Sequence, residues 1–142
     1  MDAMEKFITN DLLASHLGIE VLGYSAGKAR AKMKITSHHL NSAGILHGGA
    51  TFALADTAFA VASNSHGTLA VAINASISFL KAAREGTIFA EAEEVSINPK
   101  LATYMITVRD EKDDTIALFQ GTVYRKNEKV SDLPGSRQIP PA

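Results

Sequence analysis

The sequence predicts a single α+β domain in which an antiparallel β-sheet wraps around one long central α-helix. Residues 47–65 form an apolar segment too long for a strand, and four alternating segments follow it in succession. Consecutive strands joined by short turns pair antiparallel, and a sheet of five or six strands can bury such a helix by curling around it. The 142 residues fit one domain, 1–142, with one core.

The elements before the central helix follow from apolar spacing. Residues 2–16 are expected to form one short helix, and residues 19–23 a short strand after Gly18. Residues 28–35 alternate strictly, which predicts a half-buried strand with one basic face. Two interpretations of that face stay open: ordinary solvation, or binding of an anion. Its charged residues are Lys28, Arg30, Lys32 and Lys34.

The central helix is predicted to run from about His47 to about Ser65, with Gly67 placed to end it. Its residues leave no polar face, so the whole helix is expected inside the core. The polar segment 36–46 before it is expected to be a loop.

Four strands are predicted after this helix, at residues 69–79, 88–97, 101–110 and 115–125. In the first, the apolar residues from Leu69 to Phe79 are expected on one face. In the second, the alternation changes parity, which predicts a β-bulge near Glu93–Glu94. Residues 127–142 become polar and proline-containing, and are expected to form a flexible tail.

Composition excludes several classes of function. A net charge of −1 with 20% charged residues argues against a nucleic-acid partner. The absence of cysteine excludes disulfides, thiolate metal sites and a cysteine nucleophile. The N-terminal residues do not resemble a signal peptide, and no apolar run is long enough to span a membrane. A cytoplasmic protein without a membrane partner is therefore expected.

Asp56 is the unusual residue of the central helix, because it lies within an otherwise apolar segment. A carboxylate in such a place must be paired, hydrogen-bonded or functional. A structural role would have it cap a neighbouring backbone or meet an arginine from the sheet. A functional role is suggested by Gly48–Gly49 at the helix start, where free backbone N–H groups can stabilise an oxyanion.

The spacing of these two features constrains the assembly. Eight residues separate Gly48 from Asp56, which is about 12 Å along a helix. A base or nucleophile must lie about 3 Å from the atom that it serves. The two groups therefore cannot act on one carbonyl within one chain, whereas a two-fold dimer could bring them together.

The segment "NSAGILHGGATFALADTAFAVASNSHG", followed by "AVAINASISFLKAAREG" and "ALFQGTVYR", resembles the hotdog-fold acyl-CoA thioesterases, and most closely their phenylacetic-acid-degradation (PaaI-like) branch. The similarity covers residues from about 12 to 126 and is most specific between Asn41 and Gly67. It implies a sheet wrapped around a central helix. It also implies protomers paired edge to edge, and often a homotetramer built as a dimer of dimers.

The resemblance also implies roles for individual residues. The amides of Gly48 and Gly49 would bind the thioester oxygen, and Asp56 of the partner subunit would be the nucleophile or the general base. Asn41 would orient substrate or water, and Thr57 would assist through its hydroxyl. For His47, positioning of the glycine turn is favoured over contact with substrate.

For the coenzyme A part of the substrate, the family usually has an Arg-Pro pair where this chain has Lys81-Ala82. Lys81 and Arg84 are nevertheless expected to neutralise a phosphate. Lys100 lies in a turn where relatives also carry a basic residue. Ordinary solvated charge remains the alternative for all three. Asn74 is expected to face either the substrate tunnel or the outer surface of the sheet. No metal or separate cofactor is expected.

The favoured function is hydrolysis of an acyl-CoA thioester, with an aromatic (phenylacetyl-type) or medium-chain acyl group. One alternative keeps the fold but makes the protein an acyl-CoA hydratase or dehydratase, which needs a histidine paired with an acid. The other is a non-catalytic acyl-CoA sensor, which would tolerate the loss of Asp56.

Overall fold

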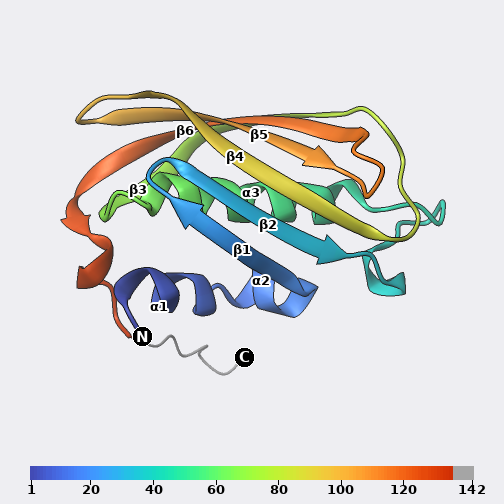
Figure 1. Ribbon diagram of the computed structural model, residues 1–142, viewed down its shortest axis with the longest axis horizontal. Helices are drawn as coiled ribbons and strands as arrows, with labels where there is room; N and C mark the ends of the chain where they lie inside the picture. The colour runs from blue at the N-terminus through green and yellow to red at the C-terminus, as the bar shows by residue number, and fades with distance from the viewer. Residues whose placement is uncertain (136–142) are drawn as a thin grey trace.

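A six-stranded antiparallel sheet curves around one long helix in the computed structural model, which describes residues 1–135 (Figure 1). The central helix is α3 (Gly48–Asn64), and all six strands contact it. The strands are β1 (Ile19–Ser25), β2 (Lys28–Lys34), β3 (Thr68–Phe79), β4 (Thr87–Ile97), β5 (Leu101–Arg109) and β6 (Thr115–Lys129). The predicted α+β class and the six strands are confirmed. Within residues 1–135, no helix combines the length and apolar character that a membrane crossing requires.

The strand order is β1-β2-β4-β5-β6-β3, so β3 does not pair with the strand that follows it. After α3 the chain enters β3 at the far edge of the sheet, beside β6. The segment 80–86 then crosses to β4 in the middle of the sheet. The two edge strands are therefore β1 and β3.

The central helix lies where the sequence predicts it. His47 is its N-cap, and Gly67 just beyond its end has a positive φ of 86°, which glycine adopts without strain. Its burial is incomplete, however. Four residues on one side of the helix, spaced at about one turn, are only half-buried. This half-buried stripe consists of Phe52, Ala53, Asp56 and Ala60. The expectation of a helix buried on all sides is wrong in this respect, because one side of α3 faces the opening of the curled sheet.

The core between α3 and the sheet depends on a close approach at one glycine. The ring of Phe59 packs against Tyr104 and Phe119, with centroids 5.9 and 5.5 Å away. A Cβ atom at Gly121 of β6 would lie 2.6 Å from Phe59 Cζ. The glycine therefore provides the space that this ring fills.

The N-terminal segment forms two short helices rather than the single predicted one. They are α1 (Ala3–Thr9) and α2 (Leu12–Leu17). Asp11 breaks the helix between them, because its backbone is extended and its side chain accepts a hydrogen bond from Ala14 N–H as the N-cap of α2.

Two strands contain irregularities. In β3 the register shifts between Ala72 and Asn74, so Val71 and Phe79 lie on opposite faces, and the prediction of one continuous apolar face is wrong. In β4 the register shifts between Glu94 and Ser96, which confirms the predicted bulge within two residues of its expected place.

The C-terminal segment is more ordered than expected. Strand β6 continues to Lys129, and a 3-10 turn, η2 (Val130–Asp132), follows. Val130 is buried, and its N–H donates to Gly67 O at 2.9 Å. The prediction of a flexible tail is therefore wrong for residues 127–132, and residues 136–142 lie outside the described part of the chain.

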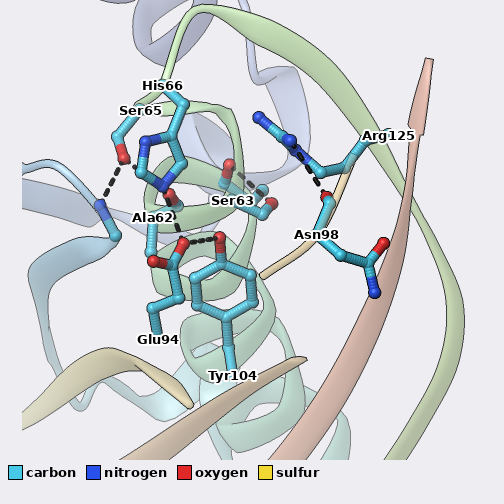
Figure 2. Close-up of polar contacts among 10 residues, drawn as sticks. Ala62, Ser63, Ser65, His66, Glu94, Asn98, Tyr104 and Arg125 are labelled. Carbon is cyan, nitrogen blue, oxygen red and sulfur yellow. Dashed lines mark hydrogen bonds and ion pairs between the residues drawn. The ribbon is translucent and has the colours of Figure 1, made fainter. Parts of the chain in front are cut away.

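A polar cluster joins the C-terminal end of α3 to the sheet (Figure 2). One carboxylate oxygen of Glu94 accepts a hydrogen bond of 2.6 Å from the Tyr104 hydroxyl and lies 2.7 Å from His66 Nε2. Ser65 accepts from Gly27 N–H at 2.8 Å, which ties the β1–β2 turn to the helix end. These contacts tie the end of the helix to β4 and to the β1–β2 turn.

Candidate active site

The start of α3 lies at one end of the molecule, where three connecting segments meet (Figure 1). Leu46 N–H donates to Ala83 O at 2.7 Å, which joins segment 36–47 to segment 80–86. Lys81 in turn reaches the turn after β5, where its ammonium lies 2.9 Å from Asp110. The first turn of the helix is thus surrounded by segments that are distant in sequence.

His47 and Gly49 form a cap at this helix start. The Nδ1 atom of His47 accepts a hydrogen bond of 2.8 Å from Gly49 N–H, so this nitrogen carries no proton while the bond exists. In the part of the chain that the structure describes, Gly48 N–H has no hydrogen-bond partner. Of the two glycine amides predicted as oxyanion donors, one is thus already used by His47 and the other is available.

A cavity of about 360 Å³ lies next to the Gly48 amide. Its wall includes Asn41, Phe79 and Lys81. The ring of Phe79 lies over Gly48, since a Cβ atom there would be 3.1 Å from Phe79 Cζ. Glycine therefore leaves the amide accessible in a place where a larger residue would meet the ring.

Asn41 holds the loop before the helix and keeps two donors available. Its Oδ1 atom accepts hydrogen bonds from Ala43 N–H at 2.9 Å and Ile45 N–H at 3.3 Å. Because the oxygen must face these two donors, the amide NH₂ is the group left over, and among residues 1–135 it has no partner. Asn41 can therefore donate a hydrogen bond into the cavity beside Gly48.

Asp56 lies on the half-buried stripe in the middle of α3. Across residues 1–135, its carboxylate has neither a hydrogen-bond partner nor a basic partner, so the structural explanation by capping or ion pairing finds no support. Burial raises its pKa above the ordinary value, and the nearby charge of Asp11 raises the pKa further. Both effects favour the protonated form, which makes the carboxylate more basic than usual.

Thr57, the next residue, is buried, and its hydroxyl donates to Ala53 O at 2.8 Å. Its proton is thus used within the helix, and its oxygen can still accept a hydrogen bond.

Gly48 and Asp56 lie on one helix, as expected, so about 12 Å separates them along its axis. Within one protomer they cannot serve the same carbonyl. A site that uses both groups would therefore need a second subunit.

The predicted coenzyme-binding lysines are far apart. Lys100 lies near the ring of Tyr124, at 5.9 Å, and Tyr124 is paired with Val71 near the start of β3. Lys81 comes just after Phe79 at the other end, about 26 Å further along that strand. Lys81 also lies 2.7 Å from Asp114, so two carboxylates already neutralise its charge. Within one protomer these two lysines cannot hold the same phosphate.

Arg84 and Asn74 complete the predicted set. Arg84 is exposed in segment 80–86, and among the described residues it forms no ion pair. Asn74 is paired with Thr122, whose neighbour Gly121 faces the core, so Asn74 lies on the outer face of the sheet, away from α3. Of its two expected placements, the outer surface is the observed one.

Sequence reasoning missed four contributors to this region. Phe79 gave no signal, because its contact with Gly48 joins a strand end to a helix start. Asp110 and Asp114 belong to a turn that the sequence marks only as acidic, and their pairing with Lys81 was not predicted. Asp11 could have been recognised as a helix N-cap from the Asn-Asp pair at positions 10–11, but its proximity to Asp56 is tertiary.

Comparison with known proteins places the chain in a family. Residues 43–117 match the Thioesterase superfamily. The chain is 38% identical over 117 residues to the acyl-coenzyme A thioesterase PaaI of Escherichia coli, covering 82% of this chain and 84% of that protein. It is 49% identical over 120 residues to a putative esterase of Archaeoglobus fulgidus, covering 84% of this chain and 78% of the relative.

Solved structures agree with the sequence matches. The E. coli PaaI protein from the phenylacetic acid degradation operon superimposes with a TM-score of 0.85 at 35% identity, over 88% of this chain and 91% of that one. A mutant PaaI from Thermus thermophilus gives a TM-score of 0.79 at 37% identity, over 82% of this chain and all of the other. The chain therefore belongs to the thioesterase superfamily, as a thioester hydrolase of the PaaI-like group with the hotdog fold.

Proposed function

We propose that the protein hydrolyses acyl-CoA thioesters to a free acid and coenzyme A, and that two subunits build each site. The Gly48 N–H of one subunit polarises the thioester carbonyl, and Asp56 of the partner subunit acts on its carbon. The observation that carries this proposal is the unpaired, half-buried carboxylate of Asp56, which lies on the open stripe of the helix that also displays the free Gly48 amide.

The edge strand β3 supports a dimer. Its 12 residues include no charged residue and no proline, and positions 71–76 are exposed. Unprotected edges of this kind invite pairing with another strand. Antiparallel pairing of two β3 strands would place the helix of one protomer beside that of its partner. Pairing of two such dimers gives the tetramer that we propose for the full assembly.

The chemistry needs no metal or separate cofactor. The attacked carbon gains an electron pair from its nucleophile while the carbonyl oxygen gains negative charge, which the Gly48 N–H stabilises. The C–S bond then breaks, and the thiolate of coenzyme A leaves. Asp56 either removes the proton of a water molecule that attacks, or attacks directly to form an anhydride that water then cleaves. A raised pKa suits the first route, because a more basic carboxylate accepts a proton more readily.

Other residues have supporting roles in this proposal. The NH₂ group of Asn41 donates to the substrate or to the attacking water, and the hydroxyl oxygen of Thr57 accepts from the same water. His47 holds the Gly49 amide and so fixes the turn that presents Gly48. Arg84 is the basic residue proposed to meet a coenzyme A phosphate, since Lys81 is already paired.

The acyl group is proposed to be aromatic, of the phenylacetyl type, or of medium chain length. The E. coli relative is described as an acyl-coenzyme A thioesterase from a phenylacetic acid degradation operon, which supports a coenzyme A thioester as the substrate. The protein is proposed to act in the cytoplasm, where such thioesters are found.

Thiol release from a panel of straight-chain, phenylacetyl and hydroxylated aromatic acyl-CoAs tests the proposal. The wild type should release thiol, and Asp56→Asn should lower kcat by about 1,000-fold while remaining folded. Glu93→Gln is the matched control, because Glu93 is an exposed carboxylate on the outer face of the sheet, and this variant should keep full activity.

Other results would point to the alternatives. Binding of acyl-CoA without thiol release, unchanged in Asp56→Asn, would indicate a sensor. Addition of water to an enoyl-CoA would indicate a hydratase. Full activity in Asp56→Asn would overturn the assignment of the catalytic acid.

A further inference from the structure

A second cavity, of about 470 Å³, lies between the two N-terminal helices, the start of β1 and the middle of α3. Its volume falls within the range of small-molecule pockets in proteins. Aliphatic and aromatic side chains form much of its wall, among them Phe7, Ile8, Ile19 and Val61. Of the residues that line it, the proposed reaction uses only Thr57.

The cavity begins next to the proposed catalytic acid. Thr57, the residue after Asp56, lines it, and so does Ala60, one helical turn further along the half-buried stripe. The spacing from Asp56 to Ala60 is four residues, about 6 Å. Asp11, the N-cap of α2, also lines it. If Asp56 acts on the carbonyl carbon of a thioester, the acyl chain attached to that carbon would therefore enter this cavity within a few bonds.

The two cavities of a protomer have different chemistry. The one beside Gly48 includes the polar side chains of Asn41 and Lys81, and it lies about 12 Å from Asp56 of the same chain. The one beside Asp56 is closed on one side by α1 and α2, and its lining includes the acidic residues Asp11 and Glu20 but no lysine or arginine. A phosphate-bearing coenzyme arm would meet carboxylates without a counter-charge there, whereas an uncharged acyl group can pack against the aliphatic and aromatic part of its wall.

We infer that the cavity between the N-terminal helices and α3 holds the acyl group of the thioester, so that residues 3–17 determine which acyl groups are accepted. This inference rests on the proposed function. It assigns an apolar acyl group of aromatic or medium-chain size to a cavity whose wall is formed partly by Phe7 and Ile8 of α1 and Ala14 of α2. The specificity-determining side chains are thus those of Phe7 on α1 and Ala60 on α3.

Two substitutions change the cavity in opposite directions. Ala60→Leu adds three carbons to the wall next to Asp56 and should exclude bulky acyl groups. Phe7→Ala removes a ring and should admit longer chains. Leu13→Ala is the matched control, because Leu13 is an apolar residue of α2 that is exposed and does not line the cavity.

The first measurement is kcat/KM for acetyl-CoA, phenylacetyl-CoA, octanoyl-CoA and lauroyl-CoA. For Ala60→Leu, the ratio of phenylacetyl-CoA to acetyl-CoA should fall about tenfold, since a few methylene groups in a pocket discriminate by about this factor. For Phe7→Ala, the ratio of lauroyl-CoA to octanoyl-CoA should rise. For Leu13→Ala, both ratios should equal those of the wild type. Unchanged ratios in both cavity variants would overturn the inference.

A binding measurement separates this inference from the proposed hydrolysis. In the Asp56→Asn background, calorimetry should show that phenylacetyl-CoA binds more tightly than coenzyme A itself. Adding Ala60→Leu should remove most of that advantage without weakening coenzyme A. Failure of the wild type to hydrolyse any acyl-CoA, with this pattern intact, would reject the hydrolysis and keep the acyl site. The acyl site would be rejected, even in an active enzyme, if phenylacetyl-CoA bound no more tightly than coenzyme A. It would also be rejected if the tighter binding of phenylacetyl-CoA persisted in Ala60→Leu.

Discussion

The ring of Phe79, at the end of β3, lies over Gly48, at the start of α3, so that a Cβ atom on Gly48 would come within 3.1 Å of Phe79 Cζ. Both residues line the same cavity. Because Phe79 is 56% exposed, its ring can move when it is pushed. The contact therefore affects access to the amide more than the stability of the fold.

Gly48→Ala should accordingly lower kcat by about 100-fold, which is the usual effect of losing one oxyanion donor. Its melting temperature should stay within a few degrees of the wild type. Thiol release and thermal unfolding measure the two effects. If displacement of the ring is the cause, Phe79→Ala combined with Gly48→Ala should show non-additive effects on kcat. A fully active Gly48→Ala would contradict the role of this amide.

His47 offers a test of capping against proton transfer. His47→Ala removes the acceptor for Gly49 N–H and should cost about 1 kcal/mol of stability, together with much of the activity. His47→Asn should recover most of both, because asparagine is among the best N-cap residues. Urea unfolding and thiol release give the two readouts. An Asn variant that is stable yet as inactive as the Ala variant would show that the imidazole itself takes part in the reaction.

The sequence was sufficient to predict those features that depend on local pattern. The central helix was recognisable because its apolar run is long and ends near Gly67, and Asp56 and Gly48 were found because each is unusual in that run. The pairing of β3 with β6 was not predictable, since alternation along a strand does not specify its neighbour. The register of β3 also shifts near Ile73, so side chains beyond it point to the opposite face from the one that strict alternation predicts. No glycine or proline marks this position in the sequence.

The site was only partly predictable for a related reason. Residue type and helix position suggested Asp56 and the glycine amides, but hydrogen-bond partners depend on the tertiary structure. Nothing local showed that His47 would use the Gly49 amide, or that Asp110 and Asp114 would neutralise Lys81. The same holds for the cavity beside Asp56, whose walls come from the first 21 residues and from α3.

The ionised carboxylate of Asp56 should lower the free energy of unfolding. Its folded pKa is raised, first by burial and then by Asp11, so the folded state binds the proton more tightly than the unfolded chain does. Stability is therefore lost as pH rises above the unfolded value of about 3.9. Asp56→Asn removes this charge and should melt a few degrees higher than the wild type at pH 7. The difference should shrink as pH falls towards about 4 and should be absent below it, where Asp56 is protonated in both the folded and the unfolded state.

Melting temperatures measured between pH 3.5 and 8 test this relationship independently of catalysis. Glu93→Gln again serves as the control and should follow the wild-type curve, since Glu93 is exposed on the outer face of the sheet. An Asp56→Asn protein that is less stable than the wild type at pH 7 would show that the carboxylate has a stabilising partner, and the structural explanation would return.

Gly121 tests the packing of the helix on the sheet. In Gly121→Ala, the new methyl group would lie 2.6 Å from Phe59 Cζ and 2.7 Å from Cε2, and Phe59 is buried between Tyr104 and Phe119. The ring cannot move freely, so the variant should lose about 1–3 kcal/mol of stability. Gly23→Ala is the matched control in another strand, because no atom lies within 4 Å of its added Cβ. Equal stability of the two variants in urea unfolding would contradict the close approach.

The hydrogen bond from Tyr104 to Glu94 gives the last test, at the opposite end of the central helix from Gly48 (Figure 2). Burial raises the pKa of Glu94, but the hydrogen bonds from Tyr104 and His66 outweigh it and lower the pKa overall. A carboxyl with a lowered folded pKa stabilises the protein above its unfolded pKa of about 4.3, and this stabilisation is lost as pH falls through the folded value.

Tyr104→Phe removes one of these donors with little change in shape, and it should cost about 1.5–3 kcal/mol near pH 7, the usual worth of a hydrogen bond to a charged group. The difference from the wild type should stay constant above pH 5 and decrease below about pH 4, because protonation of Glu94 then weakens the bond in both proteins. Unfolding in urea at several pH values measures it. Since the cluster lies far from Gly48, kcat of the folded variant should stay near the wild-type value. A loss of activity larger than the loss of folded protein would mean that the far end of the helix acts on the site through the position of α3.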